Sequence, residues 1–319
     1  MDRKKRSTLM GAALIILCVA AALRLTGVRT HLEAPLLRWP QGGLSRPLQT
    51  EPTLAAGPAE TTLRFDARDA ALLSLSYGDG CDYRPDLKAL LQRPLQWQLR
   101  GENPTVLIIH THGSESYTRQ PGESYASSGD YRTLDTDYNM VALGDYLGQL
   151  LEEAGIGVIH DRRLHDYPSY NSSYNHSRSA VQEYLRLYPD IVMVLDLHRD
   201  AVLMSDGSQF APTVTVAGEQ VARLMLVVGS DGSGMEHPLW QENLAMGAKL
   251  QVLLERLAPG ITRPILLRAQ RFNQDLSTGA IIVEIGAAGN TLQQAMGAIP
   301  YLAEAIIALS SGTAADSTR

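Results

Sequence analysis

In three separate stretches of the chain, a histidine or a carboxylate lies within or directly after a run of apolar residues. In the first, VLIIHTHGSE, four apolar residues are followed by His110, His112 and Glu115. The second, IVMVLDLHRD, delivers His198, and the third, AIIVEI, encloses Glu284. Imidazole and carboxylate groups are the ligands of catalytic zinc, which takes three protein ligands and leaves one position for water. These residue types therefore predict a zinc site with a further carboxylate beside it as proton acceptor.

The positions of the residues suggest a role for each. His112 and His198 fall just past two expected strands and are the preferred histidine ligands, with Glu115 as the carboxylate ligand. His110 alternates with His112, so one of the two is expected to face the metal and the other a second partner. Asp135, just before an expected helix, is the alternative carboxylate ligand.

Glu284 is the expected general base. A carboxylate within an apolar strand is costly to bury unless it has a partner or a function. The alternative is a structural ion pair with one of three nearby arginines, Arg263, Arg268 or Arg271. Arg199, directly after His198, is placed to bind a substrate carboxylate or to polarise a scissile carbonyl. No Gly-x-Ser-x-Gly motif supports a serine hydrolase instead.

Alternating strands and helices are expected to position these residues. Apolar runs predict strands at 106–109, 156–159, 191–195, 213–217, 223–228 and 280–285. Helical spacing predicts helices at 139–151, 179–188, 239–257 and 291–309. Thr291 and Gln294 form the pattern of a capping box at the start of the last helix. The order predicts an α/β fold with a mostly parallel sheet flanked by helices, which binds ligands at the carboxyl ends of its strands.

The composition excludes some classes of site. With 319 residues and a net charge of −6, the chain is not expected to present the clustered basic surface that a nucleic-acid partner requires. Its two cysteines, Cys18 and Cys81, are too few for a thiolate zinc site and are not expected to form a disulfide.

The N-terminus predicts a membrane anchor. MDRKKR precedes an apolar run from Leu9 to Leu23, and the basic cluster orients the N-terminus to the cytoplasm and the body of the chain outside it. An uncleaved anchor is preferred to a cleaved signal peptide, because Leu23-Arg24-Leu25 follows the small residues at once. The predicted divisions are a signal anchor (1–28), a Pro-rich tether (29–62), an N-terminal appendage (63–102), a catalytic domain (103–311) and a disordered tail (312–319).

Longer segments resemble the stage II sporulation protein P family between about residues 104 and 309. The segments are VLIIHTHGSESYT, DTDYNMVALGDYL, DLHRDA, HPLWQENLAMGAKL, PGITRP and RFNQDLSTGAIIVEIGAAGNT. Gly113 and Phe272 depart from the family pattern, where a larger polar residue and a tyrosine are usual.

The resemblance implies a fold similar to that of zinc-dependent N-acetylmuramoyl-L-alanine amidases. It implies cleavage of the amide between N-acetylmuramic acid and L-alanine in peptidoglycan during engulfment in sporulation, often with endopeptidase activity on stem-peptide crosslinks. By this resemblance, His112 and His198 correspond to the two histidine ligands of zinc and Glu284 to the general base. Glu115 corresponds to the carboxylate ligand, although the amidases place that glutamate nearer the first helix. The implied partners are stage II sporulation proteins D and M at the septal membrane.

Two alternative functions remain open at this point. One is a hydrolase that acts mainly on the crosslinks, and the other is a wall-binding scaffold without catalysis. Five tyrosines in polar loops, expected to be exposed, suit stacking along a glycan–peptide strand, although about half of them are expected to serve packing. They are Tyr117, Tyr125, Tyr131, Tyr170 and Tyr174.

Overall fold

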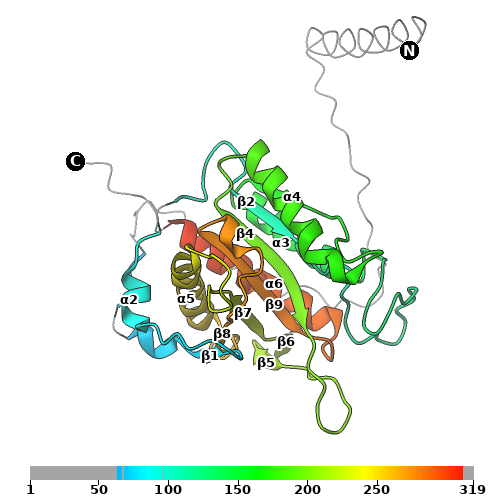
Figure 1. Ribbon diagram of the computed structural model, residues 1–319. Coiled ribbons are helices and arrows are strands. Elements are labelled where there is room, and N and C mark those ends of the chain that lie inside the picture. Colours follow the sequence, from blue (N-terminus) through cyan, green and yellow to red (C-terminus); the bar gives the residue numbers. More distant parts are fainter. Residues whose placement is uncertain (1–62, 67, 96, 312–319) are drawn as a thin grey trace, which may run out of the picture. The chain divides into compact units, whose positions relative to one another are not determined.

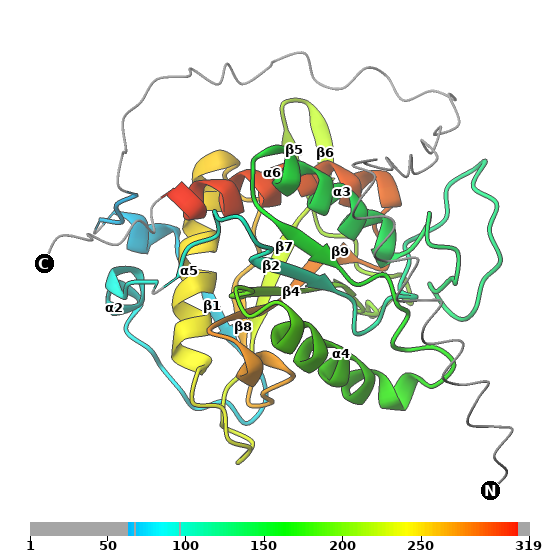
Figure 2. The same cartoon turned by 90° about the horizontal axis from the view of Figure 1, so that it is seen from above.

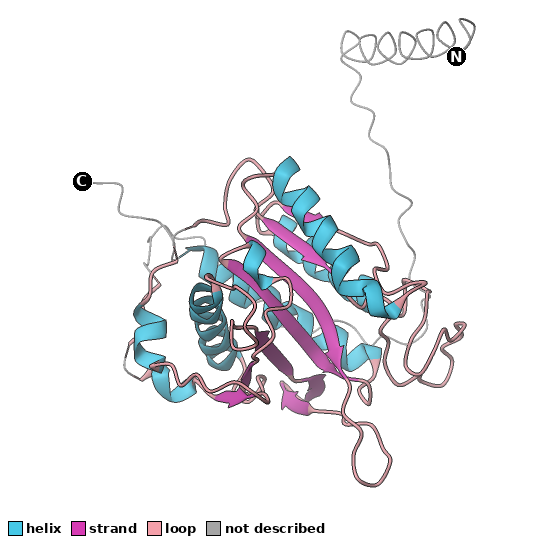
Figure 3. Cartoon of the chain, in the orientation of Figure 1, coloured by secondary structure: helices cyan, strands magenta, loops and turns pink. Residues whose placement is uncertain are grey.

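A seven-stranded sheet with helices on both faces organises the described part of the chain (Figure 1). The computed structural model describes residues 63–311 except residues 67 and 96. The strand order is β1-β8-β7-β9-β4-β2-β3, and every neighbouring pair is parallel except β7 with β9. The expected mixed α/β fold with a mostly parallel sheet is therefore confirmed (Figure 3).

The elements of this fold have the following bounds. The sheet consists of β1 (Leu75–Tyr77), β2 (Val106–Ile109), β3 (Val158–His160), β4 (Met193–Asp200), β7 (Leu224–Val228), β8 (Ile265–Leu267) and β9 (Gly279–Ala287). A separate hairpin consists of β5 (Thr213–Val216) and β6 (Glu219–Ala222). The helices are α2 (Leu87–Gln92), α3 (Met140–Glu153), α4 (Ser173–Leu187), α5 (Trp240–Leu257) and α6 (Leu292–Ser311), with 3-10 turns η1 (Asp69–Leu72), η2 (Tyr170–Ser172) and η3 (Gln274–Leu276).

The two faces of the sheet bury different residues because side chains alternate along each strand. Ile108, Leu195 and Val283 belong to the large core beneath α3, α5 and α6. Ile109 and Val194, each one residue away from a member of that core, pack instead against α4. Figure 2 shows α4 on one side of the sheet with α3 and α6 on the other.

Local sequence signals fix the ends of two helices. Gln294 N–H donates to Thr291 Oγ1 and Thr291 N–H donates to Gln294 Oε1, each at 3.1 Å, so the predicted capping box is confirmed. Gly155 ends α3 with a φ of +79°, a left-handed conformation that glycine adopts without a Cβ penalty.

Two of the predicted elements differ from their expected bounds by five residues or more. β4 extends to Asp200, five residues further than expected, because it pairs with the long strand β9 through His198 and Glu284. α4 begins at Ser173 instead of 179, because its polar, tyrosine-rich first turns lack the apolar period that marks a helix in sequence.

Residues before 103 also contribute to the sheet. β1 pairs in parallel with β8 at the edge of the sheet, and Lys249 of α5 donates to the carbonyls of Leu90 and Arg93 at the end of α2. The segment predicted as an appendage is thus tied to the sheet by backbone pairing and to α5 by hydrogen bonds.

The predicted anchor (1–28), tether (29–62) and tail (312–319) lie outside the described residues and stay predictions, as does the state of Cys18. Among the described helices, the segment Leu292–Ser310 of α6 has the length and apolar composition of a membrane span. Ala295, Ile299 and Leu302 of this helix are fully buried in the core that it shares with α3 and α5, so α6 is a core helix.

Candidate active site

The candidate site lies on the α4 face of the sheet, near the carboxyl ends of β2, β4 and β9. His198 on β4 lies directly opposite Glu284 on β9, so the two side chains project from the same face. His112, three residues beyond β2, turns to this side as well, and its ring meets the His198 ring edge-on with 5.3 Å between centroids. The structure therefore brings His112, His198 and Glu284 together from three strands.

Glu115 also reaches the site, but two arginines share its carboxylate. Its Oε2 lies 3.7 Å from His198 Nδ1 and accepts a hydrogen bond from the backbone N–H of Arg199 at 3.2 Å. Its Oε1 lies 3.3 Å from the Arg132 guanidinium and 3.5 Å from that of Arg199. These contacts hold Glu115 beside His198.

Arg199 itself is buried and engaged. Its Nε donates to the carbonyl of Ser116 and its Nη2 to the carbonyl of Tyr131, both at 3.0 Å. The guanidinium thus links β4 to the segment between Glu115 and Tyr131, a structural connection that the sequence did not suggest.

His110 and Asp135, the two alternative ligands, lie away from this group. His110 points to the α3 side of the sheet, where its Nε2 lies 2.8 Å from His160 Nε2 and its Nδ1 3.4 Å from the carbonyl of Leu197. Asp135 is exposed before α3 and accepts a hydrogen bond from the backbone N–H of Asp137. The choice between His110 and His112 depended on the turn after β2, which periodicity alone does not describe.

Glu284 has no ion-pair partner among the described residues, and its Oε2 is buried without a hydrogen bond. The arginine pairing considered as an alternative is not formed, since Arg263 pairs instead with Asp200 at 2.7 Å. Burial raises the pKa of the Glu284 carboxyl to about 8, although His198 nearby lowers it. The carboxyl can therefore exchange a proton near neutral pH.

The two histidines of the site have opposite electrostatic surroundings. Burial, followed by the neighbouring His198, lowers the pKa of His112. Burial also opposes the charged form of His198, but the charges of Asp196, Glu115 and Glu284 outweigh it and raise its pKa to about 10.

Asp196 is a residue of this site that the sequence reasoning missed. Its Oδ1 lies 2.9 Å from His198 Nε2, although the imidazole N–H is not aligned well enough to count as a hydrogen bond. Asp196 also accepts hydrogen bonds from the backbone N–H and the hydroxyl of Thr111. The period of two along a strand places residues 196 and 198 on the same face and was the available signal.

Tyrosines near the start of α4 cover His112. Tyr170 stacks on the His112 ring with 4.5 Å between centroids, and Tyr174 meets it edge-on at 5.7 Å. Tyr170 is 54% exposed and lies at the surface of the site. The expectation of an exposed Tyr117 was wrong, because this side chain is buried and donates to the carbonyl of Ile285 at 2.7 Å.

The donor set fits zinc in its chemistry. His112 Nδ1 is buried without a hydrogen-bond partner, and His198 Nδ1 lies close to Glu115 Oε2. Two imidazoles and a carboxylate form a common protein ligand set for catalytic zinc. Within the described ranges, however, no three His, Cys, Asp or Glu side chains already converge tightly enough to form a ready-made metal cluster.

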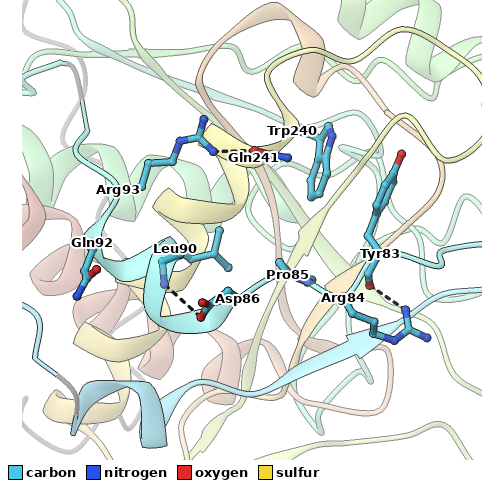
Figure 4. Close-up of a pocket in the computed structure, with 10 residues that line it drawn as sticks. Tyr83, Arg84, Pro85, Asp86, Leu90, Gln92, Arg93, Trp240 and Gln241 are labelled. Atoms are coloured by element: carbon cyan, nitrogen blue, oxygen red, sulfur yellow. Dashed lines mark hydrogen bonds between the residues drawn. The ribbon is translucent and has the colours of Figure 1, made fainter.

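A groove of about 640 Å³ lies elsewhere, between α2 and the start of α5 (Figure 4). It contains none of the predicted site residues, and its arginines are already paired. Arg93 donates to Gln241 Oε1 and to Glu242, while Arg84 donates to the carbonyls of Cys81 and Tyr83. The size of this groove therefore does not identify the chemistry of the protein.

Comparisons with known proteins identify a family. The family model described as stage II sporulation protein P matches residues 59–307. The curated protein named stage II sporulation protein P from Bacillus subtilis (strain 168) is 29% identical over 209 residues, which cover 62% of this chain and 49% of the relative. The chain thus spans about half the length of the curated relative it matches.

Solved structures show weaker likeness. The N-acetylmuramoyl-L-alanine amidase AmiC2 of Nostoc punctiforme is 12% identical with a TM-score of 0.39, covering 67% of this chain and 97% of its own. The CwlD amidase from Clostridioides difficile, solved in complex with the GerS lipoprotein, is 14% identical with a TM-score of 0.38, covering 65% and 95%. TM-scores this low do not by themselves establish a shared fold.

Proposed function

Because the chain belongs to the stage II sporulation protein P family, we propose that it is a zinc-dependent peptidoglycan hydrolase that cleaves the amide between N-acetylmuramic acid and L-alanine. His112, Glu115 and His198 would hold the metal, and Glu284 would act as the general base. The proposal includes action on stem-peptide crosslinks, which the family resemblance also implies.

The observation that carries the proposal is the pairing of His198 with Glu284 beside His112. A carboxylate oxygen that is buried without a partner, as Oε2 of Glu284 is, lowers the stability of a fold unless the site uses it. Here it stands next to two imidazoles on the ligand-binding face of a mostly parallel sheet. Hydrolysis needs such a proton acceptor close to its electrophilic centre.

Each residue has a defined task in this reaction. Zinc, when bound, supplies the Lewis acidity that activates water and polarises the scissile carbonyl. Glu284 would accept the proton of the attacking water and return it to the leaving amine. Arg199, predicted to bind a substrate carboxylate or to polarise the scissile carbonyl, is assigned a positioning role, because its donors already bind two carbonyls and Glu115.

The setting of the reaction forms part of the proposal. We place the hydrolase on the outer side of the cell membrane, held by the N-terminal anchor predicted over residues 1–28, where it would act on septal peptidoglycan during engulfment. Its proposed partners are stage II sporulation proteins D and M. Support comes from the family membership and from the basic and apolar N-terminal sequence.

Digestion of purified cell walls tests the function. Wild-type chain should release stem peptides, and a zinc chelator, His198→Ala or Glu284→Gln should abolish the release while the circular dichroism spectrum is unchanged. Mass spectrometry separates the alternatives, since free stem peptides indicate an amidase and intact but uncrosslinked muropeptides indicate an endopeptidase. Release that persists in both variants would overturn the proposed mechanism, and wall binding without any cleavage would favour a scaffold.

A further inference from the structure

Asp196 is buried beside the proposed metal ligands, yet the proposed reaction gives it no task. It lies on β4 two residues before His198, and its backbone pairs with Ile109 of β2 and Ile282 of β9. Its backbone is therefore held in the middle of the sheet by a neighbouring strand on each side.

A chain of hydrogen bonds fixes the Asp196 carboxylate. Thr111 donates its backbone N–H to Oδ1 at 2.7 Å and its hydroxyl to Oδ2 at 2.5 Å. The hydroxyls of Thr111 and of Ser177 on α4 lie 2.8 Å apart and form the next hydrogen bond of the chain. Asn273 Nδ2 donates to Ser177 Oγ at 3.0 Å and completes the chain.

Both oxygens of the Asp196 carboxylate accept hydrogen bonds from Thr111, one from the backbone N–H and one from the hydroxyl, as suits an ionised carboxylate. An ionised carboxylate accepts hydrogen bonds and donates none. The ring nitrogen that faces it is His198 Nε2, at 2.9 Å, although its N–H is tilted away from the line to Oδ1. At this separation a proton on Nε2 is favoured, because two facing lone pairs would repel each other.

The other nitrogen of the same ring faces the proposed ligands. His198 Nδ1 lies 3.7 Å from Glu115 Oε2, on the side of the ring away from Asp196. A carboxylate behind a metal-binding histidine commonly fixes the ring orientation and the tautomer in this way.

We propose that Asp196 is the positioning residue that orients the His198 ring, with Nε2 toward Asp196 and Nδ1 toward Glu115, so that Nδ1 would be free to bind the proposed metal. The inference rests on the proposed function for the identity of the metal. Asp196 acts through His198 instead of touching substrate, because the cavity that it lines with Thr111 and Ser177 measures about 20 Å³, room for no more than a water.

The test compares Asp196→Asn with Asp200→Asn in the full-length chain. Asp200 is the matched control, since it lies on the same strand two residues after His198 and pairs with Arg263. The side chains of Asp196 and Asp200 are similarly buried, with exposed fractions of 12% and 19%. Thr111→Val is the milder variant, because it removes one bond to the carboxylate and leaves the charge.

Two readouts are measured, each after a thermal melt shows that the variant folds. The first is the ¹⁵N spectrum of the imidazoles, in which the His198 signal is assigned by its loss in His198→Gln. The wild type and Asp200→Asn should show His198 protonated on Nε2, and Asp196→Asn should lose or shift that signal. The second is zinc affinity by chelator competition, which should fall by about 10- to 100-fold in Asp196→Asn and less in Thr111→Val.

The outcomes separate this inference from the proposed function. An unchanged His198 signal in Asp196→Asn would overturn the positioning role, even if the wild type binds zinc and digests walls. The positioning role is overturned as well if Asp200→Asn changes the signal as much as Asp196→Asn does. If the wild type takes up no zinc, the proposed function is contradicted. If Asp196→Asn nevertheless loses the His198 signal, the orientation of His198 by Asp196 is still supported.

Discussion

The end of β2 sends two histidines to opposite faces of the sheet, and their surroundings differ in one decisive respect. On the α3 side, His110 has partners at both ring nitrogens, Leu197 and His160, and His160 in turn lies 3.0 Å from Asp145. On the α4 side, His112 Nδ1 is buried without a partner, next to His198. We call these the closed corner (His110, His160 and Asp145) and the open corner (His112, His198 and Glu284).

The comparison shows that residue type does not distinguish a histidine with satisfied ring nitrogens from a candidate ligand. Both corners combine imidazoles with a carboxylate at the same strand end. In the closed corner the polar groups satisfy one another, so the cluster joins β2 to β3 and α3. In the open corner buried lone pairs remain available, which is what a metal or a substrate requires. The two corners should therefore respond differently to substitution and to pH.

The largest expected effect concerns activity. Glu284→Gln should lower the rate of wall digestion by about 10²- to 10⁴-fold, because the proton acceptor of the open corner is lost. His160→Gln, in the closed corner, should leave the rate close to that of wild type. Equal losses in the two variants, measured by release of soluble muropeptides, would remove the distinction between the corners.

The corners should also respond to pH in opposite directions, beginning with the open one. The pKa of Glu284 is raised to about 8, so between pH 4.5 and 8 the folded carboxyl keeps a proton that the unfolded chain has released. The metal-free protein should therefore lose stability as pH rises through this range, by at most about 1.4 kcal/mol per pH unit. Urea unfolding at pH 5 and pH 7 should show a flatter dependence in Glu284→Gln. An unchanged slope would mean that Glu284 titrates normally.

The closed corner should lose stability in the other direction. Burial, and then His160, lowers the pKa of His110 to about 3. Between pH 6.5 and 3 the unfolded chain therefore binds a proton that the folded protein does not, and stability falls as pH falls, again by at most about 1.4 kcal/mol per pH unit. His110→Gln should flatten the decline in urea unfolding from pH 6.5 to pH 4.5. A decline as steep as in wild type would place its origin in other groups.

The last expected effect concerns packing in the closed corner. A Cβ at Gly144 would collide with His160 and lie 2.7 Å from His110 Nε2. Gly144→Ala should destabilise the protein by about 1–3 kcal/mol in urea unfolding. Gly148→Ala, one turn further along α3, is the control, because its Cβ would meet Ile108 and Val158 at an ordinary 3.8 Å. The free energy of unfolding of the control should be unchanged or rise by up to about 1 kcal/mol, because alanine favours the helix more than glycine does. Equal losses of stability at both glycines would show that the histidine pair does not require a glycine at position 144.

Signals within a short stretch of sequence were sufficient for much of the fold. The apolar run of β2, the helical spacing of α3 and α5, and the capping box at Thr291 are local patterns, and the structure contains each of them. β8 and β1 were missed because three residues are too short to show a period.

The parts of the site that the sequence left open depend on contacts between strands. The face that His112 takes is set by the turn after β2, and the length of β4 by its pairing with β9. The engagement of Arg199 with the carbonyls of Ser116 and Tyr131 required the folded path of that segment. Asp196 alone was within reach of sequence reasoning, since alternation along β4 places it with His198.

The zinc content of the purified chain tests the central claim most directly. After dialysis against trace zinc and then zinc-free buffer, mass spectrometry of the metal should find one zinc per chain in the wild type and in His110→Gln, and almost none in His112→Ala. A wild type without stoichiometric zinc would contradict the account. So would a chain that keeps its zinc in His112→Ala and loses it in His110→Gln, because the metal would then belong to the closed corner.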